Sequence, residues 1–272
     1  MKNVFYPSKP KAGLNEIVKL KSTTNYTGFG LLNLDKGQVH TGTTANEEII
    51  LNILSGKCNV EVNGTMYSNV GNRKDVFSGK ASGVYVPINS KFTIQEAQGS
   101  KVEVAVMSSY AERYFAPFTY GPQDVVSEHR GFLNFQRDVH DVVIAQFEGR
   151  VDRIVVGETV VTPGNWSGYP SHKHDTFNPP HETEMEEIYH YRIKPNEGFG
   201  VQVVYNDDLS IRDSYFLKDG DSMFIAEGYH PLVVAPGFQM YYLWVMAGPK
   251  GRELIPFDDP KLTWLWNVQP LV

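Results

Sequence analysis

Histidine and glutamate are concentrated in one part of this 272-residue sequence. Five of the eight histidines lie between residues 172 and 230, which is about a fifth of the chain. Imidazole nitrogens and carboxylate oxygens are the ligands that first-row divalent metals take when no thiolate is available. The sequence therefore indicates a metal site in the second half of the chain. The residues concerned are His172, His174, His181, His190, His230, Glu182, Glu184, Glu186 and Glu187.

The spacing of two of these histidines places them on one side of a strand. Successive side chains of an extended chain alternate between faces, so His172 and His174 leave the same face and Lys173 leaves the other. A Gly-Tyr-His-Pro turn containing His230 follows later in the chain. A solitary buried histidine is usually a hydrogen-bonded core residue, but the combination of these segments favours a metal site.

Glu187 is the favoured carboxylate ligand because it opens an apolar strand, whereas the glutamates before it lie in a polar, proline-rich loop. Strand alternation sends Tyr189 and Tyr191 to the same face as Glu187. The same parity points Glu186 and His190 to the opposite face. We therefore expect His190 to be structural.

The strands that must position these residues are short apolar runs bounded by Gly, Asn, Asp or Pro. Their spacing of about 8 to 12 residues is typical of a β-sandwich or β-barrel and argues against an α/β fold with crossover helices. The sequence predicts strands at residues 28–34, 49–54, 58–62, 83–86, 102–108, 154–161, 187–193, 200–205, 214–217, 222–225, 233–235 and 240–246.

A break separates the strands into two series. The stretch from Tyr110 to Val142 carries proline turns and mixed charges, and we place a linker there. The expected domains are residues 1–125 and residues 126–272.

The two halves resemble each other in short segments, which indicates a duplicated β-domain. The run beginning at Glu48 is similar to the run beginning at Glu187, and Asn89 corresponds in the same way to His230. No His-x-His precedes Glu48, and His40 stands alone. We therefore expect the first half to lack a metal site and to play a structural role.

Composition excludes several classes of protein. Apolar residues make up 41% and the formal net charge is -6 with no long basic run, so we expect no nucleic-acid partner. Cys58 is the single cysteine, which rules out an intramolecular disulfide and is typical of a reducing cytoplasm. We expect no signal peptide and no membrane span, because no apolar run is long enough. The sequence lacks the motifs of a nucleotide or flavin site.

The candidate ligands His172, His174, Glu187 and His230 resemble the metal-binding motifs of the cupin superfamily. Twelve residues separate His174 from Glu187, more than in most cupins, so a loop must bulge out between the two strands. Longer blocks resemble the 5-deoxy-glucuronate isomerase family of bacterial myo-inositol catabolism. These blocks are residues 164–175, 186–192, 198–202, 228–231 and 241–248.

The resemblance implies an all-β bicupin, with two double-stranded β-helix (jelly-roll) barrels in one chain. Residues 1–125 would form a barrel without a metal, and residues 126–272 a barrel with the active site. The implied reaction is the aldose–ketose isomerisation of 5-deoxy-D-glucuronate to 2-deoxy-5-keto-D-gluconate. The resemblance favours zinc as the metal, although manganese, iron or nickel would also suit three histidines and one glutamate.

The remaining site residues are hypotheses from strand parity and charge. Tyr189, Tyr191 and Glu184 are candidates for proton transfer. The substrate carboxylate calls for a cation, and the candidates for substrate binding are Arg153, Gln202 and Lys173.

Two alternatives from other classes stay open. A cupin dioxygenase could use the same ligands to hold iron, and it would consume oxygen. A non-catalytic sugar-binding cupin would bind the sugar acid without turnover. The default expectation for a β-rich enzyme with exposed sheets is a homo-oligomer.

Overall fold

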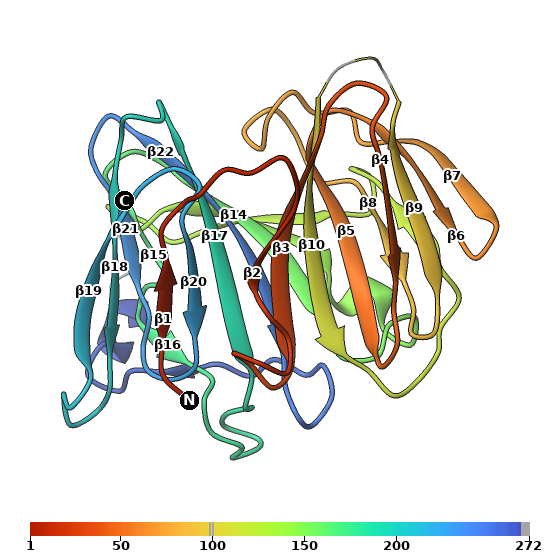
Figure 1. Ribbon diagram of the computed structural model, residues 1–272. Helices are drawn as coiled ribbons and strands as arrows, with labels where there is room; N and C mark the ends of the chain where they lie inside the picture. Colours follow the sequence, from red (N-terminus) through yellow and green to blue (C-terminus); the bar gives the residue numbers. More distant parts are fainter. Residues whose placement is uncertain (98, 100, 268–272) are drawn as a thin grey trace.

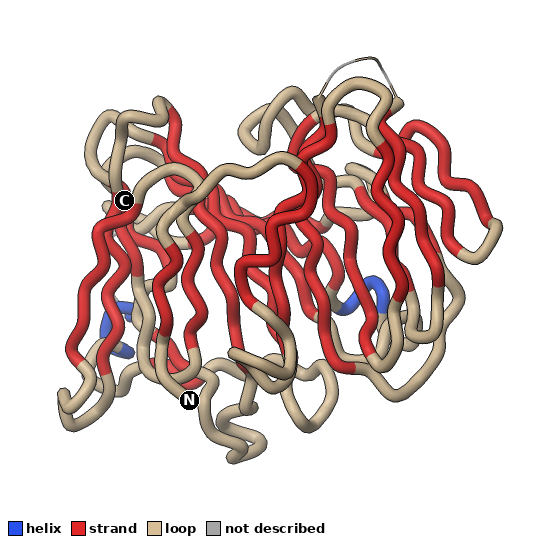
Figure 2. Tube along the Cα trace, viewed as in Figure 1, coloured by secondary structure: helices blue, strands red, loops and turns tan. Residues whose placement is uncertain are grey.

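Two antiparallel β-barrels lie side by side in the computed structural model, which describes residues 1–97, 99 and 101–267 (Figure 1). Figure 2 shows strands and loops almost throughout, with two short 3-10 turns as the only helical segments of the described residues. These turns are η1 (Ala145–Phe147) and η2 (Thr263–Asn267). The expected all-β architecture of two cupin barrels is therefore confirmed.

The first barrel, on the right in Figure 1, consists of two sheets that face each other. The six-stranded sheet contains, in spatial order, β11 (Phe118–Tyr120), β8 (Gly83–Val86), β5 (Glu47–Ser55), β10 (Val102–Tyr110), β3 (Thr27–Leu34) and β2 (Gly13–Val18). The four-stranded sheet contains β4 (Val39–Thr43), β9 (Lys91–Glu96), β6 (Cys58–Val62) and β7 (Thr65–Val70).

The second barrel is built in the same way from a larger sheet and a smaller one. The seven-stranded sheet contains β1 (Val4–Tyr6), β20 (Ser222–Ile225), β17 (Glu186–Lys194), β22 (Gln239–Ala247), β14 (Val155–Val161), β13 (Arg137–Val143) and β12 (Val126–Arg130). The four-stranded sheet contains β15 (Trp166–Ser167), β21 (Leu232–Val234), β18 (Gly200–Tyr205) and β19 (Arg212–Leu217). A two-stranded ribbon contains β16 (His172–Lys173) and β23 (Phe257–Asp258).

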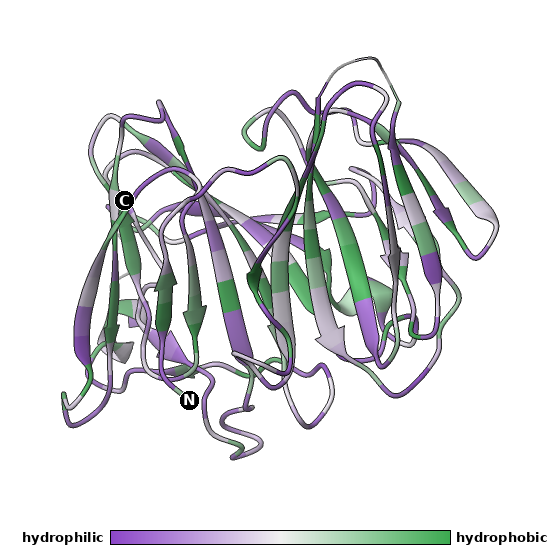
Figure 3. Ribbon diagram, viewed as in Figure 1, coloured by the Kyte–Doolittle hydropathy of each residue, from purple (hydrophilic) through white to green (hydrophobic). Residues whose placement is uncertain are grey.

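Three apolar clusters hold this arrangement together, one inside each barrel and one between them. On β5, Ile49 packs inside the first barrel and its neighbour Ile50 packs in the cluster between the barrels. On β22, Tyr242 packs inside the second barrel and Tyr241 packs between the barrels. Both faces of these strands are buried, which explains why apolar residues occupy successive positions along them, as in the green stretch of β5 (Figure 3).

The region expected to be a linker, from Tyr110 to Val142, is instead mostly strand. β11 pairs with β8 of the first barrel, and β12 and β13 extend the larger sheet of the second. The expectation was wrong because β12 is exposed along its whole length at a sheet edge, so its sequence is polar and lacks a buried apolar face. The division expected after residue 125 falls between β11 and β12.

One strand crosses between the two halves of the chain. β1 pairs with β20, so Val4 lies opposite Phe224 in the second barrel, and the chain then crosses to β2 of the first (Figure 1).

A buried ion pair also bridges the barrels, because Arg73 contacts Glu158 of β14 at 2.7 Å. Asn52 and Tyr241 each donate a further hydrogen bond to Glu158 at 2.8 Å. The interface is thus apolar around a fully partnered charge pair.

Candidate metal centre

Strand register places a set of polar side chains inside the second barrel. Glu187, Tyr189 and Tyr191 alternate with residues that face the first barrel, and both tyrosines belong to the interior cluster. Ile188 packs in the cluster between the barrels, which is the opposite face. The side chain of Glu187 is 4% exposed, so its carboxylate is almost completely shielded from solvent.

The His-x-His segment lies opposite this sheet. His172 opens β16, where it pairs with Asp258, and the imidazole of His174 follows at a ring-centroid distance of 6.2 Å. The ring of His230 lies 5.1 Å from that of His172 and 5.0 Å from that of His174. Each of the three offers a ring nitrogen, and these atoms lie within 4.8 Å of one another. The three histidines could hold a metal ion.

Glu187 completes the cluster. Its Oε2 atom lies 3.1 Å from His174 Nε2 and 3.2 Å from His230 Nε2. The Nδ1 atom of His174 contacts the carbonyl oxygen of Met185 at 2.9 Å, and that of His230 contacts the carbonyl of Gly228 at 2.8 Å. A neutral imidazole that donates from Nδ1 presents a lone pair at Nε2, so these two nitrogens and the carboxylate converge as acceptors.

This donor set fits a divalent cation. His230 Nε2 is buried and forms no hydrogen bond within the described part of the chain, although Glu187 Oε2 lies 3.2 Å away. Convergent acceptors in a buried site repel one another unless a proton or a metal ion lies between them. Nitrogen and carboxylate ligands in this arrangement are typical of sites for zinc, manganese, iron or nickel.

The pKa values follow from burial and from this convergence. Burial and the imidazoles of His230 and His174 lower the pKa of His172 to about 3. Burial alone would raise the pKa of Glu187, but His174 and His230 outweigh it and bring that pKa down to about 2. Glu187 is therefore a carboxylate at any physiological pH.

The long loop between the two ligand segments is held by a buried acid. Glu182 accepts hydrogen bonds from Lys173 Nζ at 3.0 Å and from the backbone N–H of Asp175 at 2.8 Å. Asp175 in turn accepts the backbone N–H of Gly228 at 2.8 Å. The loop thereby ties the His-x-His segment to the turn that carries His230. This role of Asp175 and Glu182 could not be predicted, since nothing in their spacing distinguishes a buried acid from a solvated one.

A second chain of hydrogen bonds supports His230. Tyr191 donates to Gln202 Oε1 at 3.0 Å, and Gln202 Nε2 donates to the carbonyl oxygen of His230 at 2.6 Å. The amide of Gln202 is thus engaged at both ends by the protein. Tyr191 and Gln202 position the turn that carries His230.

The other predicted residues lie in different surroundings. Tyr189 is inside the barrel, with its ring centroid 6.0 Å from that of His230. Glu184 is exposed. Lys173 forms ion pairs with Asp175 at 2.6 Å and with Glu182 at 3.0 Å. The roles assigned to these residues stay predictions.

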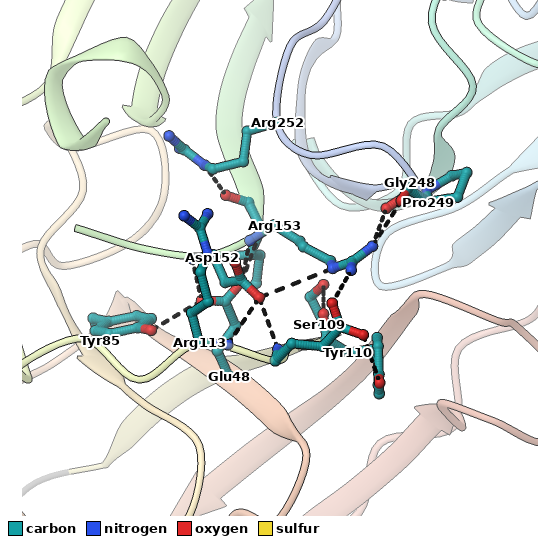
Figure 4. A network of polar contacts seen from close by, with 12 residues as sticks. Glu48, Tyr85, Ser109, Tyr110, Arg113, Asp152, Arg153, Gly248, Pro249 and Arg252 are labelled. Carbon is teal, nitrogen blue, oxygen red and sulfur yellow. Dashed lines mark hydrogen bonds and ion pairs between the residues drawn. The ribbon is translucent and has the colours of Figure 1, made fainter. Parts of the chain in front are cut away.

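Arg153 binds groups from both barrels (Figure 4). It donates to the carbonyl oxygens of Gly248 and Pro249 at 3.2 and 3.0 Å, and its Nη2 atom donates to Glu112 at 2.7 Å. Its charge is therefore already balanced by the protein.

The corresponding region of the first barrel is differently built. Glu48 faces the second barrel, where it accepts the backbone N–H groups of Asp152, Arg153 and Ile154 at 2.8, 2.6 and 2.8 Å (Figure 4). Asn89 is an exposed turn residue with a φ of 53°. The similarity of short segments was therefore misleading at side-chain level, because Glu48 has the opposite strand parity to Glu187.

Sequence reasoning missed Arg137, which is only 8% exposed and lies on the inner side of β13 opposite Val161. Its strand fell within the expected linker. The signal that could have found it is weak, because polar residues at positions 138, 140 and 141 obscure the alternation that begins at Arg137.

A barrel pair with one cluster of three histidines and a glutamate defines the class of protein as a bicupin. The sequence model of the KduI/IolB family matches residues 6–265, and the chain belongs to this family. A relative from Geobacillus thermodenitrificans, named 5-deoxy-glucuronate isomerase, is 38% identical over 241 residues, covering 88% of this chain and 86% of the relative. The relative of the same name from Bacillus subtilis strain 168 is 32% identical over 253 residues, covering 93% and 92%.

Solved structures agree with the fold. A crystal structure of an IolB-like protein from Salmonella typhimurium has a TM-score of 0.91 at 29% identity and covers 97% of this chain and 99% of its own. An oxalate decarboxylase from Lactobacillus farciminis has a TM-score of 0.64 at 11% identity, covering 95% of this chain and 88% of its own, which shows a shared bicupin fold. Among the described residues, no helix is long and apolar enough to cross a membrane.

Proposed function

We propose that this protein is a metal-dependent isomerase that converts 5-deoxy-D-glucuronate to 2-deoxy-5-keto-D-gluconate in myo-inositol catabolism. The observation that carries the proposal is the cluster of His172, His174 and His230 inside one barrel, in which His174 and His230 contact the Glu187 carboxylate. The name shared by relatives that cover most of the chain supplies the substrate.

His172, His174, Glu187 and His230 would hold one divalent ion, and we propose zinc. When bound, such an ion supplies Lewis-acid stabilisation for negative charge on substrate oxygens. The carbonyls of Met185 and Gly228 fix the imidazole orientation of His174 and His230.

Residues around the cluster would handle protons during the aldose–ketose exchange. Burial and the charge of Glu187 raise the pKa of Tyr189 well above its ordinary value, so this phenol stays protonated at neutral pH. It is suited to donate a hydrogen bond to a substrate oxygen near His230. Tyr191 keeps its proton for the same reasons, and the exposed Glu184 would reach substrate only if its loop closes over the barrel.

We also propose a cytoplasmic homo-oligomer that needs no nucleotide or flavin. The single cysteine, Cys58, is buried, and burial raises the pKa of its thiol to about 12, so the thiol stays protonated at neutral pH. Light scattering on the purified protein gives the oligomeric state directly.

The test combines elemental analysis with an assay in the absence of oxygen. We expect about one zinc per chain, isomerisation of 5-deoxy-D-glucuronate without oxygen, loss of turnover on chelation and its return with zinc. Turnover that requires oxygen would favour a cupin dioxygenase instead. Tight binding of the sugar acid without turnover would favour a non-catalytic sugar-binding cupin.

A further inference from the structure

Arg137 is a buried cation inside the second barrel. It lies opposite Val161 in the β13–β14 pairing, and directly opposed residues of an antiparallel pair share one face of the sheet. Val161 and Val139, two residues along β13, both belong to the interior cluster of this barrel. Arg137 therefore points into the same space as Glu187 and the inner tyrosines.

The guanidinium of Arg137 has no acidic partner among the residues that the structure describes. Its Nη1 atom donates a hydrogen bond to the carbonyl oxygen of Phe135 at 3.0 Å. The other interior arginines are balanced, since Arg73 pairs with Glu158 and Arg252 pairs with Glu148, both at 2.7 Å. A buried charge without a counter-ion is costly, so the site of Arg137 is incomplete without an anion.

The protein leaves room for the guanidinium and fixes its orientation. Gly131 has a φ of +86°, and a Cβ atom there would lie 2.8 Å from Arg137 Nη1 and 1.9 Å from the Phe135 carbonyl oxygen. Only glycine fits at this point. Because Phe135 occupies Nη1 alone, the Nε and Nη2 donors remain available, and together they match the two oxygens of a carboxylate.

A series of contacts leads from Arg137 toward the histidine cluster. Arg137 donates to the carbonyl oxygen of Phe135, whose ring lies 5.7 Å from that of Tyr169, three residues before His172. The ring of Tyr242 lies 4.9 Å from that of Tyr189, which in turn lies 6.0 Å from that of His230. Tyr242 and Tyr189 both belong to the interior cluster of this barrel, toward which Arg137 also points.

We propose that Arg137 binds the carboxylate of the sugar-acid substrate and so orients the opposite, carbonyl end toward His172, His174 and His230. The inference rests on the proposed function for the identity of the substrate. The arginine and lysine favoured from sequence, Arg153 and Lys173, already form ion pairs, whereas Arg137 has no acidic partner among the described residues. Burial also lowers the pKa of Arg137, and a bound carboxylate would reverse that effect.

The test compares two ligands of the same shape that differ in charge. D-glucuronate and its uncharged amide, D-glucuronamide, are titrated calorimetrically into the metal-loaded wild type and into Arg137→Gln, Arg137→Lys and Arg212→Gln. Arg212 is an exposed arginine of the same barrel and serves as the matched control. Melting temperatures of all variants establish that they are folded.

We expect the wild type and Arg212→Gln to bind glucuronate at least about tenfold more tightly than glucuronamide, as for a desolvated charge pair. Arg137→Gln should bind both ligands equally, with unchanged affinity for the amide. Arg137→Lys should keep part of the preference, because lysine retains the charge but loses the two-pronged geometry. In the isomerase assay, Arg137→Gln should raise KM by about tenfold or more.

Three results would overturn the proposal: a wild type without preference for glucuronate, a preference that survives in Arg137→Gln, or an equal loss in Arg212→Gln. Failure of the proposed function is a separate outcome. A wild type that does not isomerise 5-deoxy-D-glucuronate, yet shows an acid preference that depends on Arg137, would refute the isomerase and leave the carboxylate site standing.

Discussion

Each barrel has a buried glutamate on corresponding strands of its larger sheet, and the two carboxylates have opposite surroundings. Glu187 on β17 faces the interior of its barrel and meets two imidazoles. Glu48 on β5 faces outward and accepts three backbone N–H groups and the hydroxyl of Tyr85. A shift of one residue along a strand moves a side chain to the opposite face of the sheet. This shift decides whether a buried glutamate lies inside its barrel or at the contact between the two barrels.

The largest expected effect comes from removing a ligand. His174→Ala should lose most of its bound metal, and isomerase activity should fall by at least about 10³-fold, because the cluster is left with an incomplete ligand set. His40→Ala is the matched control in the first barrel, where His40 is half-buried on β4 and packs against Phe92. Equal metal loss in both variants, measured by elemental analysis, would contradict the assignment of the site to the second barrel.

The charge pair shared by the two barrels should dominate stability. Glu158→Gln should lower the free energy of unfolding by about 3 to 4 kcal/mol, because it leaves the Arg73 guanidinium buried and unpaired. Urea titration measures this change. The effect should be on unfolding rather than on the metal content of the folded protein.

The same pair predicts an acid limit to stability. Burial raises the pKa of Glu158, but Arg73 outweighs it and holds this pKa below its ordinary value of 4.5. The pair therefore stabilises the folded protein above about pH 4.5, and this contribution is lost as the pH falls toward the folded-state pKa. Glu158→Gln should flatten that part of the stability profile, and an unchanged profile would refute the role of the pair.

Exchanging the carboxylate for an amide in each barrel tests the comparison directly. Glu187→Gln should reduce activity by about 10²-fold, since the amide is a poor metal ligand. Glu48→Gln should keep the activity of the folded protein but lower the free energy of unfolding by about 2 kcal/mol, because an amide nitrogen cannot accept the N–H groups of Asp152 and Arg153. If Glu187→Gln and Glu48→Gln lose activity and stability in the same proportion, the two carboxylates do not have different roles.

The smallest effect is expected at the support of His230. Tyr191→Phe removes the donor to Gln202, and the looser turn should weaken metal affinity by about tenfold. A competition titration with a chelator measures this affinity. Tyr215→Phe, on the outer strand β19, should leave it unchanged.

Sequence reasoning succeeded where apolar periodicity or a motif carried the signal. The strands expected at residues 49–54, 187–193 and 240–246 match β5, β17 and β22, which have both faces buried. Edge strands such as β12 were missed, because solvent on both faces removes the pattern. Strand parity brought Glu187 to the face of the histidine cluster and His190 to the other, where it contacts Ser222 at 3.0 Å.

The rest depended on contacts between segments far apart in the sequence. Nothing local shows that Arg153 is neutralised by Glu112 and by the carbonyls after β22, or that Arg137 meets no acidic group in the described residues. The sequence around Asp175 and Glu182 is typical of a solvated loop. In the fold, Glu182 is buried, and both acids accept backbone N–H groups that hold the loop in place. The pairing of each charged side chain with a partner therefore depends on the assembled barrels and not on the local sequence.

The crossing of β1 into the second barrel links the two barrels during biosynthesis. Residues 4–6 are made by the ribosome long before residues 222–224, with which they pair. While the first barrel emerges and folds, this strand has no partner and must wait as an open edge. The second barrel therefore completes its larger sheet with a strand that precedes the first barrel, so a single cut between the barrels would separate the second barrel from its edge strand.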